Sequence, residues 1–197
     1  MLHHKTADEG FEAVPTRANS PMQLRRWNFK LGNDRQVVPA LTTQIVKRVA
    51  GDLSYSLRRA LRRSLHELIF NAIEHGNLQI GWASKRHALT SGRWEELIAA
   101  RQATKMLNQR SVSVAVYRDH RAVNAIVEDD GKGFDWRKLR EPDFSSPNGR
   151  GIFLVRASVD ELRYNERGNR AMVTLSNETS SRVTRPNLTQ RRTMVEH

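Results

Sequence analysis

The chain has 197 residues, of which 38% are hydrophobic and 27% charged, so one good-sized domain or two very small ones can form around a buried core. It has no cysteine, which excludes disulfides, thiolate metal sites and a cysteine nucleophile, and favours a reducing cytoplasm. No apolar stretch approaches the roughly 20 residues that a membrane helix needs, so we expect a soluble cytoplasmic protein without a membrane partner.

The formal net charge of +12 predicts attraction to polyanions. The basic residues are scattered along the chain, however, which is typical of a solvated surface or of a docking face for an acidic partner. No helix-turn-helix, zinc or aromatic RNA-binding signature accompanies the charge, so we expect no nucleic-acid partner. The basic residues include Arg25 and Arg26 on a predicted strand, Arg58, Arg59, Arg62 and Arg63 on a predicted helix, and Arg182, Arg185, Arg191 and Arg192 in the tail.

The first part of the chain predicts a strand and two helices after a polar, flexible segment, 1–20. Residues 24–31 alternate between apolar and polar side chains, as in a half-buried strand. A helix is expected from Arg35, capped by Asn33 or Asp34, with Val37 among its inward residues and a stop at Gly51. A second helix is expected from Ser54 or Ser56 to Gly76, with a narrow stripe of leucines.

The middle of the chain predicts a helix and a hairpin. In the segment 78–110, which we call the insertion, residues 93–107 have a helical pattern. The apolar runs 111–117 and 122–127 alternate and are joined by a short polar turn, which predicts a β-hairpin.

The last part predicts a long loop, a helix and a final hairpin. Residues 135–148 contain two prolines and two serines, and a loop of this length is typically a functional lid or disordered. A short apolar helix is expected at 152–159, and a hairpin at 161–165 and 170–175. The chain then divides into a flexible segment (1–20), one domain (21–177) and a basic flexible tail (178–197).

Three polar residues on the second predicted helix are candidates for a binding site. Glu67, Asn71 and His75 are spaced by four residues, so they drift only about 80° around the helix and share a face beside its apolar stripe. Buried polar groups need partners, which a ligand phosphate and its magnesium ion would supply. The alternative is structural: His75 and Gly76 could simply end the helix, and the other two could satisfy internal networks.

Two glycine-containing motifs supply further candidates. Residues 128–134 (EDDGKGF) follow an apolar strand, where Gly131 and Gly133 allow a sharp turn and close approach to a flat ring, and an acidic group can accept from an adenine amine. Taken alone, this motif is also typical of an ordinary turn. Residues 148–151 (NGRG) precede a predicted helix, whose N-terminal amides and the Arg150 charge favour phosphate. A lone Gly-x-Gly is weak evidence.

The order of these motifs resembles that of the Bergerat-fold ATPases. The stretches HELIFNAIEHGN (66–77), EDDGKGFD (128–135) and GRGIFLV (149–155) look especially like the anti-sigma-factor serine/threonine kinases and related regulators. The resemblance spans about residues 24–176. It implies an α+β two-layer sandwich with a mixed, mostly antiparallel sheet and helices packed on one face.

The resemblance also implies roles for individual residues. Glu67 matches the family's general base, Asn71 its ligand for Mg²⁺, and Asp129 its adenine-reading aspartate. The glycines that shape the nucleotide pocket and its lid are matched by Gly131, Gly133, Gly149 and Gly151.

Two features depart from the family. Bergerat-fold ATPases usually carry a threonine in the last hairpin that supports the adenine-binding aspartate, whereas residues 168–172 (GNRAM) have no hydroxyl group. The insertion is also longer than in compact anti-sigma kinases, and looks more like that of ATPase domains beside receiver or phosphatase domains in bacterial signalling proteins.

Two functions remain open. The first is a serine/threonine protein kinase that transfers the γ-phosphoryl group of ATP to a small anti-anti-sigma-like partner in a bacterial partner-switching pathway. In it Glu67 activates the hydroxyl and Arg150 neutralises developing charge, since positioning and electrostatics dominate phosphoryl transfer. The second is a non-catalytic, ATP-gated module that sequesters a sigma factor or another signalling partner. Whether the chain forms a homodimer is left open.

Overall fold

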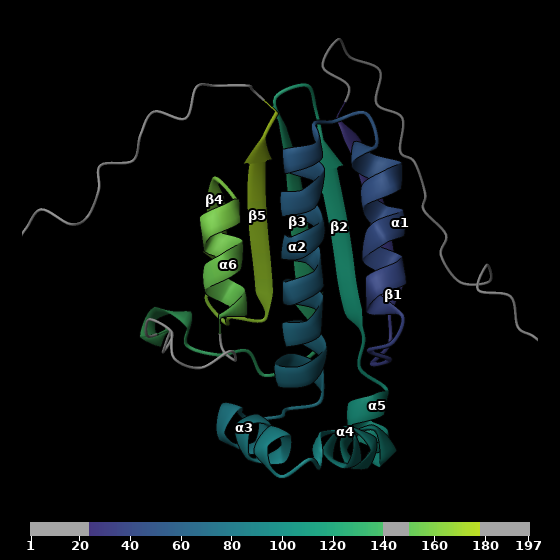
Figure 1. The fold of residues 1–197 in the computed structure, drawn as a ribbon, viewed down its shortest axis with the longest axis vertical. Helices are drawn as coiled ribbons and strands as arrows, with labels where there is room; N and C mark the ends of the chain where they lie inside the picture. The colour runs from purple at the N-terminus through teal and green to yellow at the C-terminus, as the bar shows by residue number, and fades with distance from the viewer. Residues whose placement is uncertain (1–23, 140–149, 178–197) are drawn as a thin grey trace, which may run out of the picture.

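The protein is a two-layer α+β sandwich, as predicted. A computed structural model describes residues 24–139 and 150–177. Its sheet has five strands in the order β1-β2-β3-β5-β4, and helices α1, α2 and α6 cover one face (Figure 1). All four strand pairings are antiparallel, where a mixed, mostly antiparallel sheet was expected. The strands are β1 (Arg25–Leu31), β2 (Val112–Arg118), β3 (Ala122–Asp129), β4 (Glu161–Tyr164) and β5 (Arg170–Ser176).

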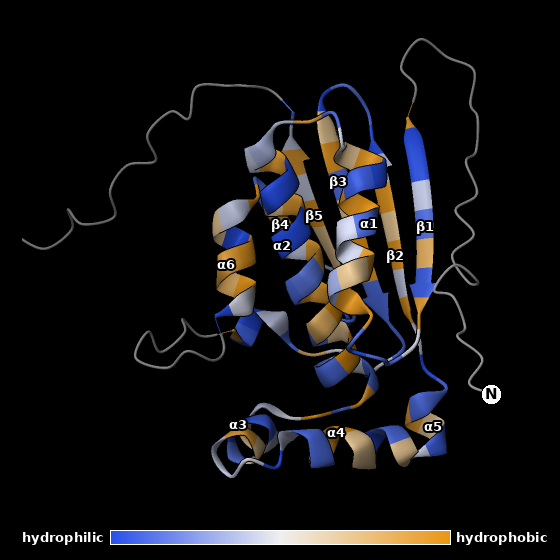
Figure 2. Cartoon of the chain, turned by 45° about the vertical axis from the view of Figure 1, so that its right-hand side comes forward, coloured by the Kyte–Doolittle hydropathy of each residue, from blue (hydrophilic) through white to orange (hydrophobic). Residues whose placement is uncertain are grey.

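The alternation in the central strands places one apolar face against the helices. Val114 on β2 pairs with Val127 on β3, and Val116 pairs with Ala125; all four side chains are buried. Successive side chains of a strand point to opposite faces, so the intervening pair, Ala115 and Ile126, faces away from the core. Figure 2 shows the hydrophobic side of the helices turned towards this sheet. The predicted hairpin is confirmed.

The second helix is also confirmed, with a change of geometry at its end. Helix α2 (Tyr55–Asn71) begins after Ser54, whose side-chain oxygen accepts from the Leu57 N–H, and its leucine stripe is buried. The chain then continues as a π-helix, η1 (Ala72–Asn77), in place of the last turns of α-helix. Such turns occur frequently at functional sites.

The first helix starts later than predicted. Helix α1 covers Val38–Ala50 and not the residues from Arg35 onwards. The reason is Pro39, which lacks an N–H and is tolerated only in the first turn. Val37, predicted to face inward, precedes the helix and is 37% exposed. Asn33 is no helix cap either: its buried amide donates to the Leu107 carbonyl oxygen at 2.9 Å.

The insertion contains more helix than its sequence indicated. It forms α3 (Trp82–Thr90), α4 (Trp94–Ala103) and α5 (Lys105–Asn108), which lie across one end of the sandwich (Figure 1). Helix α3 was not predicted, because it buries only Ala88 and therefore has no apolar stripe from which a helix could be predicted.

The start of the predicted lid is fixed to the domain. Residues 136–138 form a short 3₁₀ helix, η2 (Trp136–Lys138). The Trp136 Nε1–H donates to the Asn165 carbonyl oxygen at 3.0 Å, and its ring stacks on Tyr164. The rest of the predicted lid, 140–148, lies outside the described residues, as do the predicted flexible segment 1–20 and the predicted tail 178–197.

Helix α6 (Gly151–Ser158) follows the predicted lid in the sequence and lies beside α2. Within 24–139 and 150–177, no helix is both long and apolar enough to cross a membrane.

Candidate functional site

A cavity of about 910 Å³ lies where α2 and η1 meet α3, α6, the end of β3 and the β4–β5 hairpin. This size is typical of a small-molecule site. The cavity brings together residues that are far apart in the sequence. Of the predicted site residues, those that line it are Glu67, Asn71, His75, Asp129, Gly133 and Gly151.

The change from α2 to η1 lies between Asn71 and His75, so it affects only the last of the three helix residues. Glu67 and Asn71 lie one α-helical turn apart on the cavity wall, whereas His75 lies within η1. The His75 Nδ1–H donates to the Ile80 carbonyl oxygen at 2.6 Å. Burial lowers the pKa of His75, and this hydrogen bond only partly opposes the effect. The ring is therefore neutral at pH 7, and its Nε2 is left as an acceptor.

Glu67 lies at the end of the cavity formed by α6. A Cβ atom on Gly151 would lie 3.3 Å from Glu67 Cδ and would overlap its Oε2, so the carboxylate packs directly on the first residue of α6. The free amides and the dipole at a helix N-terminus favour negative charge, either this carboxylate or a phosphate.

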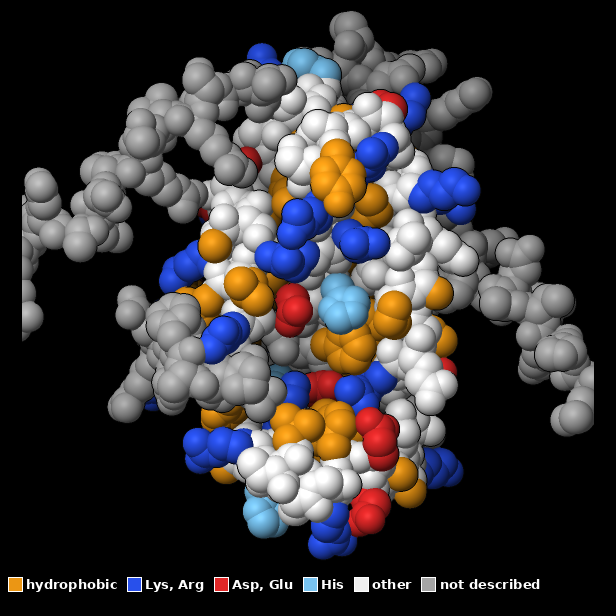
Figure 3. Space-filling model, in the orientation of Figure 1, with side chains coloured by type: hydrophobic (Ala, Val, Ile, Leu, Met, Phe, Trp, Pro, Cys, Tyr) orange, Lys and Arg blue, Asp and Glu red, His pale blue; other side chains and the backbone are white. Residues whose placement is uncertain are grey.

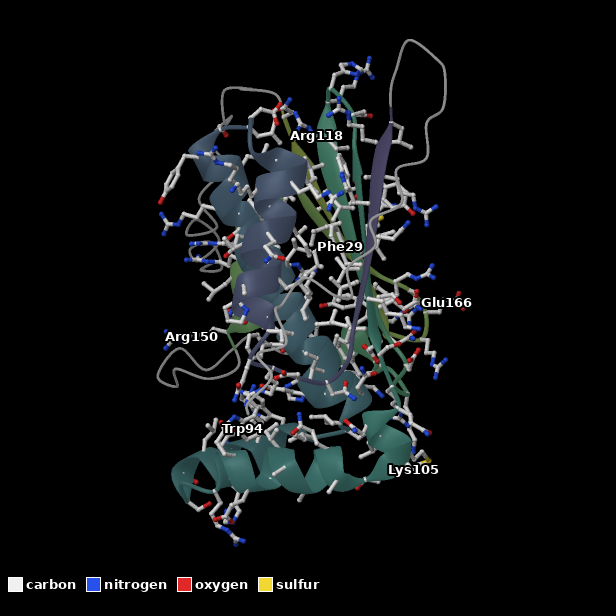
Figure 4. All side chains as sticks on the ribbon, turned by 90° about the vertical axis from the view of Figure 1, so that its right-hand side faces the viewer. Phe29, Trp94, Lys105, Arg118, Arg150 and Glu166 are labelled. Carbon is white, nitrogen blue, oxygen red and sulfur yellow. The ribbon has the colours of Figure 1, made fainter. Side chains whose placement is uncertain are left out.

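Two other residues predicted for this end are less well defined. Arg150 immediately precedes α6 (Figure 4) and is not among the described residues that line the cavity. Its predicted role in charge neutralisation stays a prediction. Gly149 lies outside the described residues.

Asp129 lies at the opposite end of the site, where β3 stops. It is 9% exposed, and its Oδ1 accepts from the Gly131 N–H at 2.8 Å. The carboxylate packs on Gly76 of η1, where a Cβ atom would lie 2.6 Å from Asp129 Oδ2. Burial raises the pKa of Asp129 to about 6, although the Gly131 N–H partly opposes it. A buried acceptor of this kind suits a ligand amine.

The two glycines after β3 were predicted to let the backbone approach a flat ring of the ligand. In the structure, the space beside each of them is taken by another backbone segment. A Cβ atom on Gly131 would lie 2.5 Å from the backbone carbon of Gly76, and one on Gly133 would lie 2.8 Å from that of Arg167. Gly133 also has φ +76°, a left-handed conformation that favours glycine. Both glycines therefore let backbone segments pack together around the cavity.

Asn169 lies in the part of the last hairpin where Bergerat-fold ATPases usually carry a threonine, which this chain lacks. Its Nδ2 donates to the Asp129 carbonyl oxygen at 2.7 Å, and its own carbonyl oxygen accepts from the Asp129 N–H at 3.0 Å. Asn165 in turn donates to Asn169 Oδ1 at 2.9 Å. An amide thus fixes the end of β3 through its backbone. The hairpin predicted at 161–165 and 170–175 gave Asn169 no role beyond the turn between its strands, so this contact was not predicted.

Helix α3, which was not predicted, forms one wall of the cavity. Trp82, Lys85 and Arg86 all line the cavity. They are spaced i, i+3 and i+4, so they share one face of the helix. This spacing is the signal that would have revealed them, had α3 itself been predicted.

The residues present fit a magnesium ion that arrives with a nucleotide. Mg²⁺ usually keeps several waters and binds one or two protein oxygens together with substrate phosphates. Within the described part of the chain, no group of three or more His, Cys, Asp or Glu residues could hold a metal ion by itself. The Asn71 amide oxygen, with Glu67 on the same wall, suits a metal that is shared with a phosphate chain.

Comparison with known proteins supports a nucleotide site. No curated protein matches the chain. Residues 97–176 match the family described as the histidine kinase-like ATPase domain. This segment begins within α4 and ends with β5, so it includes Asp129 and Gly151 but not Glu67 or Asn71. Over these residues the chain is similar to the histidine kinase-like ATPases, and its α+β fold is consistent with an ATP-binding domain of that kind.

Proposed function

We propose that this protein is a serine/threonine protein kinase that transfers the γ-phosphoryl group of MgATP to a hydroxyl group of a small anti-anti-sigma-like partner. The similarity to ATPase domains supports ATP binding. The observation that carries the kinase proposal is the position of Glu67: it packs on the N-terminus of α6, one turn of α2 from Asn71. A pure binding site needs no carboxylate there.

The geometry suits phosphoryl transfer, in which positioning and charge stabilisation do most of the work. Asp129 would accept from the adenine amine at one end of the cavity, and the amides at the start of α6 would face the phosphates at the other. Asn71 would hold the metal ion, which neutralises the phosphate charge. Glu67 would orient or deprotonate the acceptor hydroxyl, and Arg150 would offset the developing charge.

The surface beside the site suits an acidic protein partner. Arg59, Arg62 and Arg63 lie on α2 and are exposed, and none has a hydrogen bond or an ion pair within the described residues. Like charges three or four residues apart destabilise a helix slightly, so an opposing surface would relieve that cost. Arg63 is one helical turn from Glu67, so a protein docked there would bring its hydroxyl close to the cavity.

The second candidate is the ATP-gated module without catalysis. It is favoured by residues 168–172, which lack the hydroxyl group that Bergerat-fold ATPases usually carry there, and by the long insertion. The contact of Glu67 with α6 also fits it, because a carboxylate at a helix N-terminus stabilises the helix without any chemistry. In that case Glu67 would only join α2 to α6, and nucleotide binding would change the partner-binding surface.

One pair of variants separates the two functions. We expect Glu67→Gln to keep ATP affinity within a few-fold of the parent but to slow single-turnover phosphoryl transfer by roughly 10²–10⁴-fold, as for a lost general base. Asn71→Ala should lose magnesium-dependent ATP binding together with activity. If Glu67→Gln lowers only the melting temperature, or if the parent transfers phosphate to no candidate partner, the kinase proposal fails and the ATP-gated module stands.

A further inference from the structure

A buried ionic cluster joins the insertion to η1, beside the cavity. Glu74 is only 2% exposed, and its Oε1 accepts from the Arg35 Nε–H at 2.9 Å. Its Oε2 accepts from the Lys85 ammonium group of α3. Figure 3 shows an acidic side chain flanked by basic ones on this face, next to the insertion. Two cations share the buried carboxylate, and Arg35 also pairs with the exposed Glu95 at 3.4 Å, so the charges of the cluster balance.

Lys85 is held in place by an aromatic ring as well. Its Nζ lies 5.4 Å from the centroid of the Trp94 ring, and the Arg35 guanidinium lies 5.1 Å from the same centroid. Trp94 projects from α4 towards the rest of the domain (Figure 4). Such contacts attract a cation and restrict its motion. Lys85 is therefore positioned before any ligand arrives.

Glu74 would keep a charged partner without Lys85. A buried carboxylate needs a partner, and Glu74 already has one in Arg35. Lys85, in contrast, lines the cavity together with Asn71. An ammonium group carries three N–H donors, and Glu74 accepts one of them, so two are left for a ligand.

We propose that Lys85 binds the phosphate chain of the nucleotide, so that the insertion forms a functional wall of the ATP site. The inference rests on the proposed ATP binding and names a further binding residue of that same site. A charged lysine that lines the cavity supplies a cation for the anionic part of the ligand. Trp82, one turn earlier on α3, is 42% exposed and lines the same cavity, so its fluorescence should report occupancy.

The test compares matched variants of the full chain. Lys85→Met removes the charge but keeps the length and leaves Glu74 paired with Arg35, whereas Lys85→Arg keeps a cation. Lys105→Met is the control, because Lys105 belongs to the same insertion but is exposed and does not line the cavity (Figure 4). MgATP is titrated by calorimetry and tryptophan fluorescence at low and at high ionic strength.

We expect Lys85→Met to bind MgATP about tenfold or more weakly at low ionic strength, as for a lost charge-assisted hydrogen bond. The difference from the parent should shrink at high ionic strength, because salt screens the lost attraction. Lys85→Arg should stay within a few-fold of the parent, and Lys105→Met should match it.

Two results overturn the inference alone. One is a Lys85→Met protein that binds MgATP as tightly as the parent. The other is a loss of affinity that is equal at both ionic strengths and accompanied by a lower melting temperature, which is the behaviour of a structural residue. If the parent fails to bind MgATP in the same titrations, the inference and the proposed function fall together.

Discussion

The protonation of Asp129 gives the sharpest test of how this site recognises its ligand. An ionised carboxylate is a stronger acceptor for an adenine amine than a protonated one, and burial raises the pKa of Asp129 to about 6. If the ionised form alone binds, the apparent Kd equals the intrinsic Kd divided by the ionised fraction. That fraction is about 0.9 at about pH 7 and about 0.09 at about pH 5, so ATP should bind about tenfold more weakly at the lower pH.

Calorimetric titration of MgATP across this range measures the effect, and Asp129→Asn is the matched control. The asparagine cannot ionise, so any pH dependence that it retains belongs to other groups, such as the nucleotide phosphates or His75. At about pH 7 we expect it to bind at least about tenfold more weakly than the parent, since one buried polar pair is lost. Equal pH profiles for the two proteins, or equal affinities for MgATP, would refute the role of Asp129 as the acceptor for the adenine amine.

The same carboxyl group links stability to pH with a defined sign. Its pKa in the folded protein, about 6, lies above its ordinary value of 3.8. Between these values the folded protein keeps a proton that the unfolded chain releases, so the contribution to stability declines as pH rises through this window. Without nucleotide, Asp129→Asn should therefore melt at neutral pH no lower than the parent, which separates lost binding from lost folding.

Further variants test the packing around the site. Gly76→Ala should weaken ATP binding by about tenfold or more, because the new methyl group displaces the Asp129 carboxylate. Overpacking lowers the free energy of unfolding by about 1–3 kcal/mol, and the higher helix propensity of alanine offsets up to about 1 kcal/mol of this loss. Gly32→Ala, which meets nothing within 4 Å, should match the parent in both melting temperature and affinity. Trp136→Ala should speed tryptic cleavage after Lys138, because it removes the hydrogen bond that holds η2 on the last hairpin; an unchanged rate in mass-spectrometric time courses would contradict that role.

Much of the sheet and the long helix could be predicted because each has a periodic apolar pattern. The alternation at 111–117 and 122–127 indicated β2 and β3, and the leucine stripe indicated α2. These patterns arise from burial on one face, which is a local property of the sequence. Motif order then indicated which residues of α2 and of the β3 end share a site.

The π-helix could not be predicted, since its cause is tertiary. Gly76 weakens the helix propensity of Ala72–Asn77, but nothing in this sequence favours a π-helix over the end of an α-helix. In the structure, Gly76 must fit against Asp129 and Gly131, and the Asn77 amide oxygen accepts from the Asp130 N–H at 3.0 Å. These contacts with the end of β3, which is distant in the sequence, select the wider turn.

The wall formed by α3 was missed for a different reason. Its side chains pack on a ligand cavity and on an ionic cluster, and only Ala88 is buried. Such a helix lacks the stripe that signals burial, so hydrophobic periodicity cannot detect it. The partner of Lys85, Glu74, was likewise not singled out, because a buried carboxylate has no local signature.

The position of β1 at the edge of the sheet has a consequence for the order of folding. Strands β2 and β3 form one hairpin, β4 and β5 form another, and β3 pairs with β5. Leu31 of β1, in contrast, pairs with Val112, across α1, α2 and the whole insertion. Closing the long loop between β1 and β2 costs conformational entropy, which is lost before the hydrogen bonds between these two strands form. None of the residues of β1 lines the cavity, so β1 can dock last, onto a folding nucleus that already contains β3, β5 and the cavity residues on them.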